Sequence, residues 1–291
     1  MDIYIQLLIN SLQISSVYIL FSLGLTLIFG VMKVVNFAHG EFFTFVLMLM
    51  AVVLPLALGW NLPLPLAYLF AAMAGMLGTL VLGKIIYEYG FKKYQRDMIG
   101  TFVLSVGLSL LLQGIFLEVF GGMPRKLPSL IDGTVQIMGG AITTERLVLT
   151  IAALLVAVVT YWLIVSTKLG KALRAVAEDH EAAMLQGIPY KKIALAGFLI
   201  ATLLATIGAV LMSPVTVITP IIGNDYLIRG FIAIVIGGLG SIPGSILGSI
   251  IIAVIESVGG YYFDPSKATI AMFVIAALVL LIRPKGLMGH G

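Results

Sequence analysis

The stretch NFAHGEF, residues 36–42, places an amide, an imidazole and a carboxylate within six positions. Asn36, His39 and Glu41 surround Gly40 there, between two of the most apolar segments of the chain. Such side chains could form a proton relay, or hold a break between two helices by hydrogen bonds. Ionisable residues at membrane depth are costly and mark functional sites. The alternative is a solvated turn outside the membrane, and composition alone leaves both open.

A second interrupted stretch, GGLGSIPGSILGS, covers residues 237–249. Glycine and proline at this density cannot form one continuous helix. The stretch is a tight hairpin between two spans, a re-entrant break, or both. Two interrupted hydrophobic segments, one in each half of a chain, point to a transport site between them. The candidate residues here are Gly238, Gly240, Ser241, Pro243 and Gly244.

The rest of the chain is too apolar for a soluble protein. Its 291 residues are 60% hydrophobic and 10% charged, with a mean hydropathy of +1.14. Apolar runs long enough to cross about 30 Å of hydrocarbon recur throughout. We therefore predict an all-α, polytopic transmembrane bundle forming a single domain over residues 1–291, with broken or re-entrant helices near 36–42 and 237–245. The expected spans are 8–31, 41–58, 66–87, 98–119, 146–166, 192–213, 226–240, 243–258 and 268–283, which gives eight or nine crossings.

Basic residues predict the orientation of these spans, because lysine and arginine gather in cytoplasmic loops. The loop with Lys92, Lys93 and Arg96, the long loop 167–192, and the C-terminal tail with Arg283 should all be cytoplasmic. The loop 120–145 then faces outward, NFAHGEF lies in the inner half of the membrane, and the N-terminus is outside. The net charge of +4 reflects this topology, and we expect no nucleic acid partner.

Small residues at four-residue spacing, such as Gly240, Gly244 and Gly248, predict close helix packing. Among the remaining polar residues, Gln113 is expected to form an interhelical hydrogen bond. Asp225 and Arg229 are four residues apart, which favours a local ion pair. Glu256 lies late in a span and is either a pathway residue or an interfacial one. The chain has no cysteine and three histidines, so no metal site, cofactor or covalent catalysis is expected.

Four ordered motifs give a resemblance over nearly the whole chain. NFAHGEF, GKALRAVAEDHEAAMLQGI, GGLGSIPGSILGS and RPKGL resemble the permease subunits of branched-chain amino-acid ABC importers, and most closely the shorter, H-type permease. The resemblance implies a heterodimer with an M-type permease, two cytoplasmic ATPase subunits and an extracytoplasmic substrate-binding protein. It also implies a lipid-embedded protein of a bacterial or archaeal cytoplasmic membrane with a cytoplasmic C-terminus. The implied substrate is a small hydrophobic amino acid, although related systems carry urea, amides, other amino acids or aromatic acids.

The loop 167–192 resembles the coupling segment of such permeases, where a short helix docks on the ATPase. Gly187 lies four residues after the second alanine of a Glu-Ala-Ala sequence and suits a helix C-terminus. Leu173, Val176 and Leu185 are expected to supply apolar contacts. No GxxxxGK[ST] sequence is present, so the chain binds no ATP through a P-loop. The coupling residues implied are Arg174, Ala177, Glu178, Asp179, Glu181, Ala182, Ala183 and Gly187.

Two other classes of function remain possible from the residues. An ion-coupled secondary transporter could use His39 and Glu41 as a relay, and would need no ATPase. An intramembrane enzyme could use the same residues with Asn36. The permease interpretation instead gives these residues, with Glu256, a role in the helix break or the translocation path.

Overall fold

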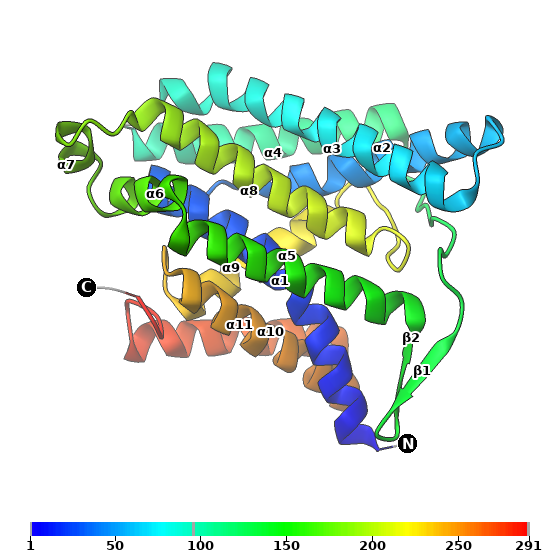
Figure 1. The fold of residues 1–291 in the computed structure, drawn as a ribbon. Coiled ribbons are helices and arrows are strands. Elements are labelled where there is room, and N and C mark those ends of the chain that lie inside the picture. The colour runs from blue at the N-terminus through cyan, green and yellow to red at the C-terminus, as the bar shows by residue number, and fades with distance from the viewer. Residues whose placement is uncertain (1, 95–96, 290–291) are drawn as a thin grey trace.

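The structure is a computed structural model that describes residues 2–94 and 97–289, so Arg96 of the first basic loop lies outside the described residues. The long helices lie side by side in one bundle (Figure 1). In chain order the elements are α1 Ile3–Met32, α2 His39–Gly59, α3 Leu64–Tyr89, a 3₁₀ turn Phe91–Lys93, α4 Met98–Phe120, β1 Thr134–Ile137, β2 Gly140–Thr143, α5 Thr144–Ser166, α6 Lys168–Glu178, α7 His180–Leu185, α8 Tyr190–Met212, α9 Ile222–Gly237, α10 Ile242–Tyr262 and α11 Pro265–Ile282.

The predicted spans correspond to α1–α5 and α8–α11. In the described part of the chain, eight helices are long and apolar enough to cross a membrane, and α9, with 16 residues, is not among them. The protein is therefore a polytopic helical membrane bundle, as predicted. The two predicted numbers of crossings, eight and nine, differ only in whether α9 is counted.

Helix α1 is the centre of the bundle. Its second half is mostly apolar on every side, and the residues from Ser15 to Met32 are almost all buried. A helix that is hydrophobic all round belongs inside a large assembly of helices. Helices α5, α6, α8, α9 and α10 all pack against α1. Its 30 residues span about 45 Å at 1.5 Å per residue, so one rod connects both ends of the bundle.

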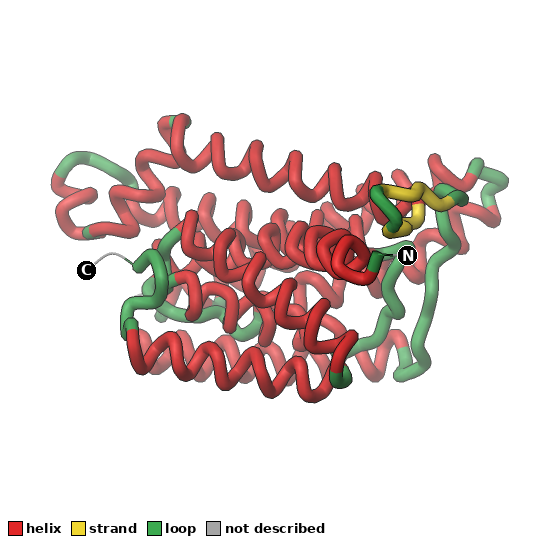
Figure 2. The backbone as a smooth tube through the Cα atoms, turned by 90° about the horizontal axis from the view of Figure 1, so that it is seen from below, coloured by secondary structure: helices red, strands yellow, loops and turns green. Residues whose placement is uncertain are grey.

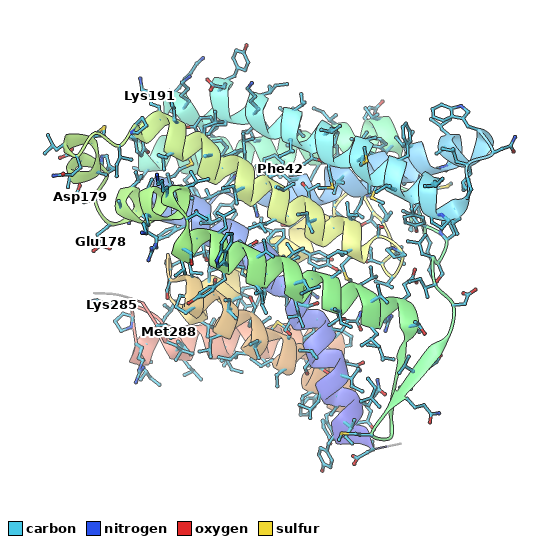
Figure 3. All side chains as sticks on the ribbon, viewed as in Figure 1. Phe42, Glu178, Asp179, Lys191, Lys285 and Met288 are labelled. Atoms are coloured by element: carbon cyan, nitrogen blue, oxygen red, sulfur yellow. The ribbon has the colours of Figure 1, made fainter. Side chains whose placement is uncertain are left out.

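The two ends of the bundle differ in character. One end carries α6, α7 and the C-terminal residues, and the other carries the N-terminus and the β-strands (Figure 1). Below, these are called the basic end and the hairpin end. The predicted basic segments share the basic end, as the labelled Lys191 and Lys285 illustrate in Figure 3.

The β1–β2 hairpin was not predicted from the sequence. The strands pair antiparallel, with Thr134 opposite Thr143. Met138 and Gly139 connect them with φ of 50° and 88°, the left-handed backbone that a tight hairpin turn needs. Gln6 of α1 holds β2 by exchanging two hydrogen bonds with the backbone of Ala141, at 2.8 and 3.0 Å. The hairpin lies beside the N-terminus in both views (Figures 1 and 2).

Helices α9 and α10 approach closely through the small residues that the sequence singled out. A Cβ atom on Gly248 would lie 2.0 Å from the carbonyl oxygen of Ala233, and one on Gly244 would lie 2.4 Å from that of Gly237. Backbone therefore touches backbone along this seam. In a membrane such close contact is a main source of helix association.

We predict that Gly248→Ala lowers the thermal stability of the purified protein in detergent, since the added methyl group must push α10 away from α9. Overpacking of this kind costs about 1–3 kcal/mol. Gly114→Ala in α4 is the matched control, because nothing lies within 4 Å of a Cβ there. Size-exclusion chromatography after graded heating measures both. Equal midpoints for the two variants would contradict the close contact.

Candidate functional site

The NFAHGEF stretch lies inside the bundle. Helix α1 ends at Met32, and the chain turns at Lys33, whose φ is 56°. Helix α2 begins at His39, whose ring lies 4.9 Å from that of Phe21 between centroids, and a Cβ on Gly24 would lie 2.9 Å from its Nε2. Gly24 precedes the end of α1 by eight residues, or about 12 Å. The solvated-turn alternative is therefore wrong: this is a helix break within the protein.

Helix α9 also begins inside the bundle, against the start of α2. A Cβ on Gly40 would lie 2.4 Å from the carbonyl oxygen of Gly223. The Gly223 N–H donates to Thr44 Oγ1 at 3.0 Å, which satisfies one of the free donors at the helix start. From this contact α9 runs to the basic end, whereas α2 runs to the hairpin end (Figure 1). Two helix N-termini thus meet within the membrane-spanning bundle.

Hydrogen bonds connect the break to α4. Oε1 of Glu41 accepts from Ser109 Oγ at 2.9 Å and from Gln113 Nε2 at 2.7 Å. The interhelical bond predicted for Gln113 is confirmed. Glu41 lies in the first turn of α2, where the helix dipole favours a carboxylate. Before it, Asn36 Oδ1 accepts from the Ala38 N–H at 3.0 Å and closes the turn that leads into α2.

Several polar atoms of the break remain without a partner. His39 and Glu41 are not bonded to each other. Buried polar atoms are paired in most proteins, so unpaired ones need an explanation. Because no hydrogen bond joins the imidazole to the carboxylate, the arrangement fits a helix break better than a proton relay between them. The unpaired atoms among the described residues are Thr26 Oγ1, Asn36 Nδ2, both ring nitrogens of His39, and Glu41 Oε2.

The second stretch is a tight turn at the basic end. Gly238 and Gly240 have φ of 114° and 82°, and Ser241 caps α10 by accepting from the Gly244 N–H at 3.2 Å. Pro243 lies in the first turn of α10, where its missing N–H costs nothing. The hairpin alternative therefore describes residues 238–241, and the break in this half of the chain is the start of α9.

The C-terminal RPKGL motif packs on this same turn. Backbone N–H groups of Leu287 and Met288 donate to the carbonyl oxygens of Ile236 and Gly237 at 2.9 and 2.8 Å. They thereby satisfy the free carbonyls at the end of α9. Gly286 has a φ of 78°, which lets the tail turn into this position. Two motifs that the sequence shows separately thus form one structure.

The coupling segment folds into two short helices, α6 and α7, at the basic end. Asp179 caps α7 by accepting from the backbone N–H groups of Glu181 and Ala182 at 2.8 and 3.0 Å. These donors lower the pKa of Asp179 below its ordinary value. Gly187 follows α7 with a φ of 80°, as its predicted place at a helix C-terminus requires. Figure 3 shows Glu178 and Asp179 at the tip of this end.

The apolar contacts expected from this segment are partly wrong. Leu173 and Val176 are 2% and 1% exposed, because they pack inward against the bundle. Leu185 is 87% exposed and remains available to a partner. Of the residues singled out in the Glu-Ala-Ala sequence, Glu181 and Ala182 are exposed, whereas Ala183 is buried.

A hollow of about 640 Å³ is lined both by predicted coupling residues and by predicted residues of the second interrupted stretch. Its walls include Arg174, Ala177 and Glu178 from α6, Gly240 and Ser241 from the turn before α10, and Pro243 from the first turn of α10. Lys33, at the end of α1, also lines it and donates from Nζ to the carbonyl oxygen of Ala177. The coupling segment is therefore in direct contact with the end of α1 and with the chain that leads to the NFAHGEF break.

The ion pair predicted between Asp225 and Arg229 is not formed. Arg229 Nε binds Glu256 Oε2 at 3.2 Å, and its Nη1 donates to the backbone carbonyl of Asp225 instead. The Tyr18 hydroxyl also donates to Glu256 Oε2, at 2.5 Å. Glu256 thus joins α1, α9 and α10 through one carboxylate oxygen.

Several residues of the site were not predicted from the sequence. Ser109 supports Glu41, Thr44 and Gly223 join α2 to α9, and Lys33 joins α1 to α6. One signal was available: Ser105, Ser109 and Gln113 recur every four residues and mark one polar face of α4. Nothing local marks the pairing of Gly40 with Gly223. Among the described residues, no three histidine, aspartate or glutamate side chains gather as a metal site would require.

This fold and site define a polytopic helical membrane protein with paired helix breaks. A family model described as branched-chain amino acid transport system / permease component matches residues 7–283, and the chain belongs to this family.

Individual relatives match nearly end to end. The high-affinity branched-chain amino acid transport system permease protein BraD of Pseudomonas aeruginosa is 31% identical, over 99% of this chain and 96% of its own. LivH of Escherichia coli K12 is 28% identical with the same coverage, and the probable LivH of Methanocaldococcus jannaschii is 28% identical over 94% and 89%. A solved structure, PsaBC from Streptococcus pneumoniae in complex with Fab, aligns over 96% of this chain and 92% of its own with a TM-score of 0.48 at 18% identity, too slight a likeness to define the fold.

We predict that Glu41 and Gln113 stabilise the bundle as a unit. Glu41→Ala and Gln113→Leu should each lower the thermal midpoint in detergent. The double variant should lose less than the sum of the two, by about 1 kcal/mol, because the first change already removes the shared hydrogen bond.

Ser105→Ala serves as the control for this cycle. Its hydroxyl donates only to the backbone carbonyl of Phe102, so its effect should add independently to that of Glu41→Ala. Additive behaviour of the Glu41 and Gln113 variants would show that their hydrogen bond contributes nothing.

Proposed function

We propose that this chain is the membrane permease subunit of an ATP-binding-cassette importer that takes up branched-chain or similar hydrophobic amino acids. The match of the permease family over residues 7–283 carries this proposal. Relatives named as branched-chain amino acid transport permeases, nearly equal to this chain in length, support the substrate class. ATP hydrolysis takes place in separate subunits.

The basic end faces the cytoplasm in this proposal. Lysines and arginines of the predicted inner loops gather there, as the distribution of basic residues in membrane proteins would require. The C-terminus is then cytoplasmic, and α7, with its exposed Leu185, is presented to the ATPase subunits. A substrate-binding protein delivers its cargo to the hairpin end, and an M-type permease completes the translocation path.

Energy passes from the coupling segment to the helix breaks. Movement of α6 and α7 reaches α1 through Lys33, and α1 in turn packs against α10. Rigid helices packed in this way transmit a push as a rigid-body shift. Asn36, His39 and Glu41 hold the break in one state, and border the passage when α2 and α9 separate. Their unpaired polar atoms favour such a rearrangement, since leaving them buried costs free energy.

Uptake by the reconstituted complex tests the proposal. Co-purified subunits in proteoliposomes, supplied with the binding protein and internal ATP, should import radiolabelled leucine, with valine and isoleucine as competitors. Urea and benzoate should not compete. ATP-dependent import of urea or benzoate instead of leucine would support an ABC importer with a different substrate. Leucine uptake without ATP would indicate a secondary transporter.

We predict that Asp179→Ala uncouples ATP hydrolysis from transport, because α7 loses the acceptor for its first two free N–H groups. The leucine imported per ATP hydrolysed should fall several-fold, while hydrolysis itself continues. Since backbone donors lower the pKa of Asp179, its carboxylate is ionised at neutral pH, and the cap is lost only as pH falls through that lowered pKa.

Asp179→Asn is the matched control, because asparagine is an equally good N-cap. It should retain the wild-type ratio of leucine to ATP. The same loss in both variants would assign Asp179 a charge contact with the ATPase in place of the capping role.

A further inference from the structure

A cavity of about 610 Å³ lies at the hairpin end, away from both helix breaks. The first half of α1, the start of α5 and the ends of α8 and α10 surround it. Its size is within the usual range of small-molecule sites. Its walls carry one acidic and one basic side chain, Glu256 and Arg146.

Glu256 offers one carboxylate oxygen to the cavity. Tyr18 and Arg229 both bind its other oxygen, Oε2, and neither of them lines the cavity. They therefore hold the carboxylate from behind. Oε1 makes no hydrogen bond to the described residues, and the side chain is 24% exposed. An acceptor held in one orientation in this way suits a cationic group.

Arg146 offers the complementary charge from the first turn of α5. Its guanidinium makes no hydrogen bond or ion pair with the residues that the structure describes. The neighbouring Glu145 carboxylate forms no ion pair with it and instead accepts from Ser129 Oγ and from the Leu130 N–H, both at 2.7 Å. A free guanidinium is the side chain best suited to a carboxylate ligand.

The remaining walls are apolar or neutral. Ile14, Met212 and Val215 supply aliphatic surface from α1, from the end of α8 and from the loop that follows it. Gln6 and Gln13 face the cavity from α1, and the side chain of Gln6 is already bound to β2. A mostly apolar site with a few placed polar groups is typical of small-molecule recognition.

We propose that this cavity is a recognition site of the permease itself for a free, zwitterionic aliphatic amino acid. The ammonium group binds Glu256 Oε1, the carboxylate binds Arg146, and the side chain lies on Met212, Val215 and Ile14. This inference rests on the proposed function, and it adds a second selection step after the binding protein. A ligand lacking either charge leaves Glu256 Oε1 or the Arg146 guanidinium without a partner, which a polar site rejects strongly.

Direct binding to the purified permease–ATPase complex, without the binding protein, tests the site. Equilibrium dialysis with radiolabelled leucine should show saturable binding. Neither 4-methylpentanoate, which lacks the amine, nor 3-methylbutylamine, which lacks the carboxylate, should displace it. Arg146→Gln should weaken leucine binding about tenfold or more, as expected for loss of a charge-assisted hydrogen bond, and remove the discrimination against 3-methylbutylamine. Glu256→Gln should do the same for 4-methylpentanoate.

Two control variants separate recognition from stability. Lys267→Gln removes an exposed cation that does not line the cavity and should leave leucine binding unchanged. Tyr18→Phe removes a hydroxyl behind Glu256 and should leave the discrimination between leucine and its analogues intact. If Tyr18→Phe and Glu256→Gln weaken binding equally and neither alters discrimination, Glu256 is purely structural and the proposal fails.

The outcomes also distinguish this site from the proposed function. Suppose that the wild-type complex imports leucine with its binding protein but shows no saturable leucine binding without it. That result overturns the site and leaves the importer function intact. Wild-type leucine affinity in the Arg146→Gln and Glu256→Gln complexes has the same meaning. If the wild-type complex imports no amino acid, both the proposed function and the proposed site are contradicted.

Discussion

Two helices of this protein begin inside an apolar bundle, and the architecture depends on satisfying their first backbone groups there. Lipid supplies no hydrogen bonds, so an interrupted helix survives only where protein covers the interruption. The starts of α2 and α9 cover one another: Gly40 lies against Gly223, and Thr44 of one helix accepts the Gly223 N–H of the other. Only glycine permits this approach, since a Cβ on Gly223 would lie 1.9 Å from the carbonyl oxygen of Gly40.

Helix α1 connects the helix break to both ends of the molecule. Tyr18 binds Glu256 beside the cavity at the hairpin end, and Phe21 packs on His39 at the break. Lys33 binds the end of α6. From Tyr18 to its end at Met32 the helix is continuous and almost entirely buried, so these contacts are spread over about 20 Å of one rod. In the proposed mechanism, a displacement of α6 at the basic end reaches the break and the far cavity through this rod.

Sequence patterns reveal what depends on neighbouring residues, and they miss what depends on tertiary register. Apolar run length placed the spans, and glycine with proline placed the turn at 238–241, since both properties are local. The partner of Arg229 is not local. Asp225 is one turn away, yet the guanidinium reaches Glu256 because α10 packs antiparallel to α9 through glycines. The pairing of Gly40 with Gly223 and of the tail with Ile236 likewise spans parts of the chain that no periodicity connects.

The β1–β2 hairpin and the depth of the helix break could not be predicted from the sequence, for related reasons. The hairpin lies in a loop whose outward position was expected, but its strands are four residues each and are fixed in place by Gln6 of a distant helix. For NFAHGEF, composition could not separate a solvated turn from a buried one, because the same polar residues suit both. Burial in the folded structure decides between them. Burial also distinguishes the roles of two carboxylates, those of Glu41 and Glu256. Glu41 is enclosed with two donors from α4, whereas Glu256 keeps one oxygen free at a cavity. The first can therefore only hold the bundle together in this conformation, while the second is placed to meet a ligand.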